Sequence, residues 1–184
     1  MKKHFLEILK ELDVSDDIIS ETPARAEKAY KEFFDGYDKD TSNIKNAFYD
    51  STMDEMIVLK NIRFESFCEH HIVPIIGTAA VGYIPNGKII GASKLARIID
   101  LFAHRLQLQE RMTIDIANFL EEILDCKGVA VYISGTHFCI SKRGVKKDGA
   151  KFVTKYFTGI MKENFELRKE FLAEIHASSN CASI

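Results

Sequence analysis

Residues 78–88 read TAAVGYIPNGK, in which a strand-like run is followed by the turn sequence PNGK. Asn-Gly favours the tight turns of β-hairpins because both residues tolerate a positive φ angle. The stretch therefore predicts a strand over residues 78–84 and a hairpin at residues 85–88.

Helical and extended patterns surround this hairpin. Before it, residues 56–59 and 62–67 predict extended chain, and after it a helix is expected to begin near Ser93. The other expected elements are a second helix with apolar positions from Met112 to Leu124, strands over 128–133 and 138–145, and a last amphipathic helix over about 158–176.

The N-terminal part predicts helices and then a long connection. Residues 1–12 carry apolar side chains at helical spacing, and Thr22-Pro23 suits the start of a helix that stops at Asp35-Gly36. Residues 37–53 are polar and show no clear period. Helices, strands, two helices, strands and a helix follow one another, which predicts an α+β fold in a single domain of 184 residues.

Composition excludes several classes of protein. The net charge is −2 and the pI is about 6.3, so no bulk basicity points to nucleic acid. Glu7 and Lys10 interrupt the apolar N-terminus, unlike in a signal peptide, and no apolar run reaches the roughly 18–20 residues of a membrane span. Four cysteines in such a chain favour metal or thiol chemistry over disulfides. We therefore expect a cytoplasmic protein without nucleic-acid or membrane partners.

Two short runs place a thiol beside an imidazole, namely Cys68-Glu69-His70-His71 and His137-Phe138-Cys139. A catalytic Zn²⁺ site uses three ligands of these types and keeps one position for water. Cys68, His71 and Cys139 would form that set. His70 and His137 would then stand beside the metal as proton carriers, which predicts a hydrolase site.

The alternative places Cys68 and Cys139 in the core, where free cysteine is commonly buried. Neighbouring residues on a strand face opposite ways, so His70 and His71 are not easily both satisfied as core groups. His137 and Cys139 are two residues apart, which places them on one face of an expected strand. A structural zinc site would need a fourth protein ligand, and none is evident beside these runs.

The run GASKLAR, residues 91–97, opens the helix near Ser93. A helix N-terminus offers free N–H groups and the positive end of the helix dipole, which together bind phosphate. Ser93 can cap the helix and donate a hydrogen bond. Lys94 and Arg97 lie near the positive end of the helix dipole, where cations are otherwise unfavourable. Such a placement is what a binding site for a polyanion would require. The alternative is a solvated basic helix start.

Other charged and polar residues also have two interpretations. Gln109-Glu110 begins the next helix, where a carboxylate interacts favourably with the positive end of the helix dipole. A carboxylate can also accept hydrogen bonds from both donors of a guanine edge. Arg143 adds a guanidinium close to the second metal run. Arg25 and Lys28, taken alone, are ordinary surface charges of the N-terminal helix.

Five motifs resemble the GTP cyclohydrolase I family. They are SFCEHHIVP at 66–74, YIP at 83–85, GASKLARI at 91–98, RLQLQERMT at 105–113, and HFC at 137–139 followed by RGV at 143–145. The run ETPAR at 21–25 is similar as well, so the resemblance extends over nearly the whole chain. Residues 150–159, AKFVTKYFTG, depart from the Ser/Thr-rich pattern of the family.

The resemblance implies the tunnelling fold, an antiparallel sheet with two helices inserted between its strand pairs. It implies an N-terminal helical extension over residues 1–54, a catalytic domain over 55–176 and a flexible tail over 177–184. Members of the family form toroidal homodecamers, which are pentamers of dimers with active sites between subunits. We therefore expect a homo-oligomer with shared sites.

The resemblance also implies a role for each candidate residue. Zn²⁺ would be bound by Cys68, His71 and Cys139, and the catalytic residues would be His70, His137 and Ser93. The substrate GTP would be bound by Glu110 at the guanine edge and by Gln109, Lys94, Arg97, Arg143, Lys28 and Arg25.

The implied reaction converts GTP and water to 7,8-dihydroneopterin triphosphate and formate, the first step of tetrahydrofolate biosynthesis. Three alternatives stay open at the level of sequence. The same chemistry could feed 7-deazaguanine synthesis, the chain could be a non-catalytic purine- or pterin-binding protein of the same fold, or its zinc could be structural.

Overall fold

The computed structural model describes residues 1–45 and 48–177. The helices are α1 Lys2–Glu11, α2 Asp16–Phe33, the 3₁₀ helix η1 Asp35–Tyr37, α3 Ser42–Lys45, α4 Ala92–Ala103, α5 Gln109–Leu124, α6 Phe138–Ser141, α7 Gly159–Glu163 and α8 Phe165–His176. The strands are β1 Phe48–Asp50, β2 Ile57–Cys68, β3 Pro74–Ile84, β4 Lys88–Ile90, β5 Leu106–Gln107, β6 Gly128–His137 and β7 Phe152–Phe157. Among the described helices, none is long and apolar enough to cross a membrane. Of the predicted tail, all but Ala177 lies outside the described residues.

A five-stranded sheet in the order β5-β2-β3-β6-β7 forms the centre of the molecule, and β1 pairs separately with β4. In this sheet the pairs β2 with β3, β3 with β6 and β6 with β7 are antiparallel, whereas the short β5 lies parallel to β2. The α+β prediction is confirmed. The expected antiparallel sheet, with two helices between its strand pairs, is present in β2, β3, β6 and β7. The short β5 departs from it, because α4 crosses back along the sheet and returns the chain in the direction of β2.

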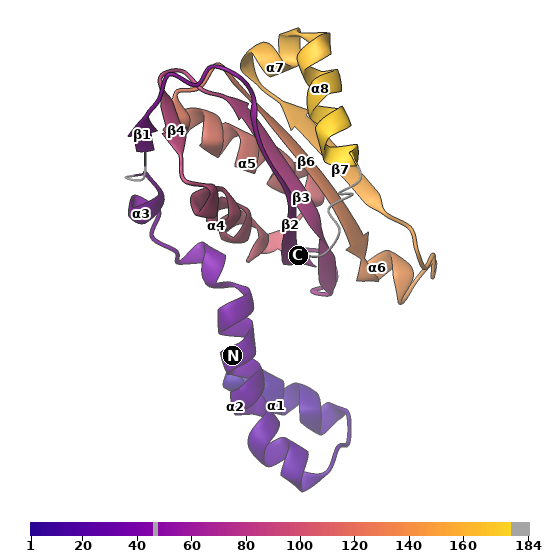
Figure 1. The fold of residues 1–184 in the computed structure, drawn as a ribbon. Coiled ribbons are helices and arrows are strands. Elements are labelled where there is room, and N and C mark those ends of the chain that lie inside the picture. Colours follow the sequence, from indigo (N-terminus) through magenta and orange to yellow (C-terminus); the bar gives the residue numbers. More distant parts are fainter. Residues whose placement is uncertain (46–47, 178–184) are drawn as a thin grey trace, which may run out of the picture.

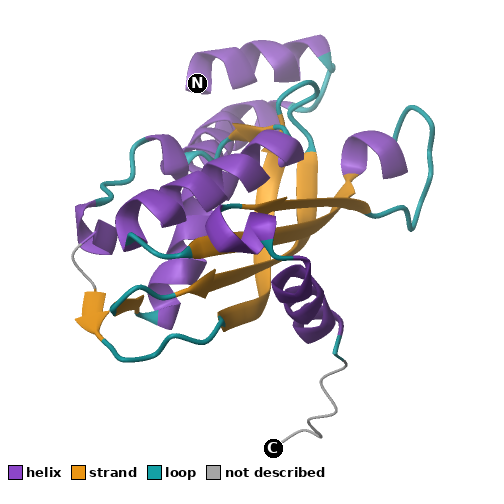
Figure 2. Ribbon diagram, turned by 90° about the horizontal axis from the view of Figure 1, so that it is seen from above, coloured by secondary structure: helices purple, strands orange, loops and turns teal. Residues whose placement is uncertain are grey.

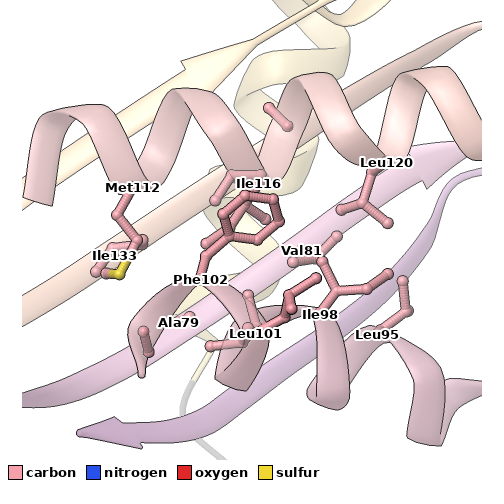
Figure 3. Packing of buried hydrophobic residues seen from close by; sticks show 14 of the residues in the cluster. Ala79, Val81, Leu95, Ile98, Leu101, Phe102, Met112, Ile116, Leu120 and Ile133 are labelled. Atoms are coloured by element: carbon pink, nitrogen blue, oxygen red, sulfur yellow. The ribbon is translucent and has the colours of Figure 1, made fainter. Parts of the chain in front are cut away.

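Helices cover both faces of the curled sheet (Figures 1 and 2). On one face α4 and α5 bury the main core, where Ile98, Phe102 and Ile116 meet Val81 of β3 (Figure 3). On the other face Met161 of α7 and Phe171 of α8 pack against a second, smaller cluster that includes β3. Since successive side chains of a strand face opposite sides, β3 is buried on both faces from Ala79 to Ile84.

Gly82 lets α8 lie directly on β3. A Cβ atom at this position would stand 2.8 Å from the ring of Phe171, closer than side chains pack. The glycine in the strand therefore marks a close approach of the helix and not a turn.

The predicted hairpin at residues 85–88 is wrong. The turn is present, with Gly87 at a φ of 81°, but the strand after it pairs with β1 and not with β3. The reason is that β3 already lies between β2 and β6, so neither of its edges is free. The backbone N–H of Ile90 in β4 donates to the hydroxyl of Tyr83 in β3 at 3.2 Å.

The predicted strand at residues 138–145 is also wrong. Phe138–Ser141 forms the single helical turn α6, and β6 takes its partner from β7. The sequence FVTKYF of β7 is rich in β-branched and aromatic residues, which fit a pleated edge strand better than the charged run after Ser141.

Two predicted helix boundaries differ from the structure. The helix expected to begin at Thr22-Pro23 begins at Asp16, and Pro23 lies inside the helix. Asp16 and Asp17 stabilise its first turn because their negative charges interact favourably with the positive end of the helix dipole. The last helix is interrupted at Asn164, whose side-chain oxygen accepts from the backbone N–H groups of Glu166 and Leu167 and so begins α8.

Helices α1 and α2 form a hairpin that projects away from the sheet (Figure 1). At its junction with the sheet, the rings of Phe33 and Phe34 lie 5.1 and 5.3 Å from the ring of Phe67. Gly36 then donates its N–H to the carbonyl of His104 and accepts from Nε of Arg105 at 3.0 Å. The end of α2 is thus attached directly beside the strand end that carries Cys68.

Candidate metal centre and active site

The turn between β2 and β3 folds His71 back onto Cys68. The carbonyl of Cys68 accepts from the backbone N–H groups of His71 and Ile72, and its own N–H donates to the carbonyl of Val73 at 2.9 Å. Ile72 adopts a left-handed φ of 53°, which closes the turn. Spacing and turn geometry together explain why a thiol and an imidazole three residues apart reach the same point.

Cys139 arrives from the far side of β3. His137 is the last residue of β6 and pairs with Ile75, while Phe67 pairs with Pro74, so the ends of β2 and β6 flank the start of β3. The single turn α6 then returns Cys139 toward Cys68. The prediction that His137 and Cys139 share one face assumed a continuous strand, but the strand ends at His137 and Cys139 lies in α6. Both residues nevertheless line one hollow.

The ligand atoms of Cys68, His71 and Cys139 all lie within 4.8 Å of one another. Sγ of Cys68 is 3.7 Å from Nδ1 of His71. A tetrahedral ion with Zn–S near 2.3 Å and Zn–N near 2.1 Å would separate sulfur and nitrogen by about 3.6 Å. The three side chains therefore fit a divalent metal of the zinc type. Within the described residues no fourth ligand joins this group, which leaves room for water.

Arg143 reaches the far side of the His71 ring, with a guanidinium nitrogen 3.0 Å from Nε2. Arginine can only donate, so Nε2 is the acceptor and Nδ1, which faces Cys68, carries the ring proton. A metal at Nδ1 would take the place of that proton. Burial and the adjacent Cys68 raise the pKa of the Cys139 thiol above its ordinary value.

A hollow of about 200 Å³ lies beside the three ligands. Its walls come from the end of β2, from β5 and the start of α5, from the end of β6 with α6, and from β7. The lining residues are Cys68, His70, Gln107, Leu108, Gln109, Glu110, His137, Cys139, Ile140 and Phe152.

His137 is held in this hollow by Gln109. Nε2 of His137 lies 2.9 Å from Oε1 of Gln109, while Nε2 of Gln109 donates to the carbonyls of Ile133 and Phe152 and to the hydroxyl of Thr154. These three acceptors fix the orientation of the amide. The oxygen of Gln109 then requires a proton on Nε2 of His137, which leaves Nδ1 as the open nitrogen.

Burial lowers the pKa of His137, and the charge of Glu110 raises it in part. The ring is therefore neutral at pH 7 and able to accept a proton. Glu110 itself is exposed at the rim of the hollow, in the first turn of α5, as a group that binds substrate from solvent would be. Gln109 is fully buried, so the predicted contact of Gln109 with substrate stays a prediction.

Glu69 and Arg111 form an ion pair that sequence reasoning missed. The Arg111 guanidinium bonds the carboxylate of Glu69, and this contact raises the pKa of Arg111. It ties the turn that carries His70 and His71 to the first turn of α5. The charge on each residue was visible in the sequence, but nothing in the spacing of residues 69 and 111 indicated the contact.

The predicted phosphate residues Ser93, Lys94 and Arg97 lie elsewhere. None of them is among the described residues that line the hollow, and Arg97 lines a separate cavity of about 160 Å³ with Lys39 and Asp100. Helix α4 runs from its N-cap Gly91 to Ala103, so its first turn is about 15 Å from the end that leads into β5. The expected side-chain cap at Ser93 is absent, because Gly91 takes that position.

Arg25 and Lys28 lie on α2, in the projecting hairpin. Arg25 pairs with Glu21 one turn earlier on the same helix. Of the predicted cations, only Arg143 lies against the metal ligands of its own chain. One chain therefore brings together the three candidate metal ligands, His70, His137, Glu110 and Arg143, but not the other predicted cations.

Comparisons with known proteins identify the family to which this chain belongs. The sequence model of the family described as GTP cyclohydrolase I matches residues 1–176. GTP cyclohydrolase 1 of Pelagibacter ubique is 46% identical over 162 residues, 87% of this chain and 80% of the relative. The enzyme of the same name from Rickettsia africae is 47% identical over 161 residues, 87% of this chain and 85% of the relative. That from Pseudoalteromonas atlantica is 41% identical over 175 residues, 94% of this chain and 95% of the relative.

Proposed function

Since the chain belongs to the GTP cyclohydrolase I family, we propose that it hydrolyses GTP to 7,8-dihydroneopterin triphosphate and formate at a zinc site formed by Cys68, His71 and Cys139. The observation that supports this most strongly is the position of the three ligand atoms beside His137 in one hollow. Zinc held by three protein ligands makes water nucleophilic near neutral pH.

His137 transfers the proton in the first hydrolysis. Its open Nδ1 accepts a proton from the attacking water as oxygen bonds to C8 of guanine. The imidazolium then gives that proton to N7. The bond between C8 and N9 breaks next, and N9 takes the remaining hydroxyl proton, which leaves a formamide on N7. Gln109 keeps the other nitrogen protonated throughout, so the ring presents the same atom in both steps.

The other residues bind the substrate and complete the reaction. Glu110 accepts the N1–H and amino donors of guanine, which fixes C8 over the hollow. A second hydrolysis releases formate from the formamide. His70, at the exposed side of the ligand turn, and Ser93 then assist ribose opening and rearrangement, after which the freed amine closes the pterin ring.

The active site is shared between copies of the chain. Ser93, Lys94 and Arg97 do not line the hollow, since they lie toward the end of α4 that is remote from β5, and α2 carries Arg25 and Lys28 away from the sheet. A neighbouring subunit in a homodecamer would supply these groups, as the family resemblance implies. The triphosphate would then lie between one subunit's metal centre and another's α4.

Cysteine variants test the proposal. Cys139→Ser should lose zinc and pterin formation together, because it removes one of three ligands. Cys126→Ser is the matched control, since Cys126 lies outside the hollow and should keep both. Zinc content is measured by atomic absorption and pterin by fluorescence after mild oxidation. Wild-type zinc content in Cys139→Ser would refute the ligand assignment.

A further inference from the structure

Phe152, the first residue of β7, brings a benzene ring to the wall of the hollow. The residue is 38% exposed, and it shares the hollow with the polar groups of Gln109, Glu110 and His137. Sites for small ligands combine apolar or aromatic walls with a few placed polar groups in this way. The roles proposed above leave the ring without a function, and it lies in the segment that departs from the Ser/Thr-rich pattern of the family.

The strand holds Phe152 on the face of the sheet that carries the hollow. Thr154, two residues later, accepts from Nε2 of Gln109 at 3.1 Å, and its hydroxyl lies 2.6 Å from that of Thr113 in α5. Alternate residues of a strand share a face, so the ring of Phe152 lies on the same side of β7 as α5. The carbonyl of Phe152 also accepts from Nε2 of Gln109 at 3.0 Å, which fixes the backbone at this point.

His137 orients the ring from one side. Phe152 pairs with Gly135 of β6, and His137 is the diagonal neighbour across the two strands, within reach of an aromatic side chain. The centroids of the two rings are 5.3 Å apart and their planes meet at 77°, which is a T-shaped contact. Such a contact occupies at most one face of Phe152. At least one face of the benzene ring is therefore free of this contact.

The proposed substrate supplies a flat ring that needs a wall. The two hydrogen bonds from the guanine edge to Glu110 lie in the plane of the base, so they do not by themselves fix its tilt about that edge. C8 is at the opposite end of the purine, where a tilt displaces an atom most. Aromatic side chains stack on nucleobases because every base has a π face, and a ring against that face restricts the tilt.

We propose that the ring of Phe152 stacks on the purine of GTP, so that Glu110 holds the base by its edge and Phe152 holds it by its face. This inference rests on the proposed function, since it assigns Phe152 to the guanine of that substrate. Because the same ring contacts His137, one side chain aligns the base with the group that transfers the proton. Phe152 itself binds substrate and takes no part in proton transfer.

Kinetic constants give the first test. Phe152→Leu keeps an apolar side chain but removes the π face, so the KM for GTP should rise about 10-fold while kcat changes less. Phe152→Tyr keeps the π face and should recover most of the lost affinity. Zinc content, melting temperature and the mass of the oligomer are measured alongside and should match the wild type.

Phe165→Leu is the matched control. Phe165 is an exposed phenylalanine of α8, where its ring contacts Arg168 and Lys169, and it does not line the hollow. The same substitution at this position should leave the KM for GTP at the wild-type value.

A fluorescent reporter tests the stacking directly. The chain has no tryptophan, so Phe152→Trp places a single indole in the hollow. Its emission should be quenched when the zinc-loaded protein binds a GTP analogue carrying an oxo group at C8, because a stacked guanine quenches an excited indole. Inorganic tripolyphosphate, which has no base, should leave the emission unchanged. The indole of Phe165→Trp should respond to neither ligand.

Three outcomes would overturn the stacking contact. They are a wild-type KM in Phe152→Leu, an emission of Phe152→Trp that ignores the analogue although this variant still forms pterin, or a fall in zinc content, stability or oligomer mass that accounts for the higher KM. A fall in oligomer mass would assign the ring to a contact between subunits. If the zinc-loaded wild type forms no pterin but the indole is still quenched, the proposed function fails and the guanine contact stands.

Discussion

Oε1 of Gln109 lies 2.9 Å from Nε2 of His137, and the amide nitrogen of the same glutamine is occupied by three acceptors of β6 and β7. This contact selects the tautomer of His137 and leaves Nδ1 open. It connects the geometry of the sheet to the protonation state of the proposed general acid and base.

Gln109→Leu should therefore impair catalysis without releasing the metal. The ring loses its partner and the choice of tautomer, so kcat should fall about 10- to 100-fold. The melting temperature should also fall, because the carbonyls of Ile133 and Phe152 and the hydroxyl of Thr154 lose their donor. Steady-state kinetics with parallel zinc analysis checks this, and a wild-type kcat in folded, zinc-loaded protein would contradict it.

Gly36→Ala should destabilise the junction of α2 with the sheet. A Cβ there would stand 2.5 Å from the carbonyl oxygen of Leu101 and 2.7 Å from that of His104. Displacing packed backbone costs about 1–3 kcal/mol in unfolding free energy. Gly91→Ala is the control, since the nearest atom, Cγ of Lys94, is 4.0 Å away and the expected cost is below about 1 kcal/mol. Equal unfolding free energies of the two variants would be evidence against this tight junction.

The elements with the clearest periodicity could be predicted from sequence. The buried stripes of α4 and α5 and the extended runs of β2, β3 and β6 appear where expected, because each places apolar residues on a single face or in a continuous run. The convergence of two candidate metal ligands, Cys68 and His71, could be predicted for a related reason. Cys68 and His71 are near in sequence, so a local turn suffices to bring them together.

Pairing between distant segments could not be predicted in the same way. The sequence PNGK correctly indicated a turn, but whether β4 pairs with β3 depends on β6, which already occupies that edge. The partner of β6 was misassigned because residues 138–145 follow it directly, whereas the true partner, β7, begins at Phe152. Contacts such as Glu69 with Arg111 depend on the same long-range arrangement.

Cys126 should react slowly with thiol reagents in the folded protein. Burial raises its pKa to about 11, compared with 9.0 for a free thiol. At pH 8 the thiolate fraction, and hence the alkylation rate, should be about 100-fold lower than in the unfolded chain. The contribution of this neutral thiol to stability is fully present below pH 9 and is lost as the pH rises toward 11.

Mass spectrometry of the Cys126 peptide after timed iodoacetamide treatment, with and without denaturant, measures this difference. Equal rates in the two states would show that the thiol is not protected. Zinc-loaded protein is used, so that Cys68 and Cys139 do not compete for the reagent.

Mixed oligomers should reveal the shared site. Cys139→Ser lacks the metal, and a Lys94→Ala, Arg97→Ala double variant lacks the proposed phosphate cations, so each alone should be inactive. Chains of both kinds assembled together in equal amounts should recover activity, since about a quarter of the sites would combine two intact halves. If the mixture stays as inactive as its components, the metal and phosphate groups do not come from different chains.

The central claim is that a zinc ion at Cys68, His71 and Cys139 drives GTP hydrolysis. The most direct measurement is pterin formation from GTP by the purified wild-type chain before chelation, after chelation, and after zinc is restored. The account predicts one zinc per chain, loss of the pterin signal on chelation, and its return with zinc. Undiminished pterin formation by protein shown to contain no metal would contradict it.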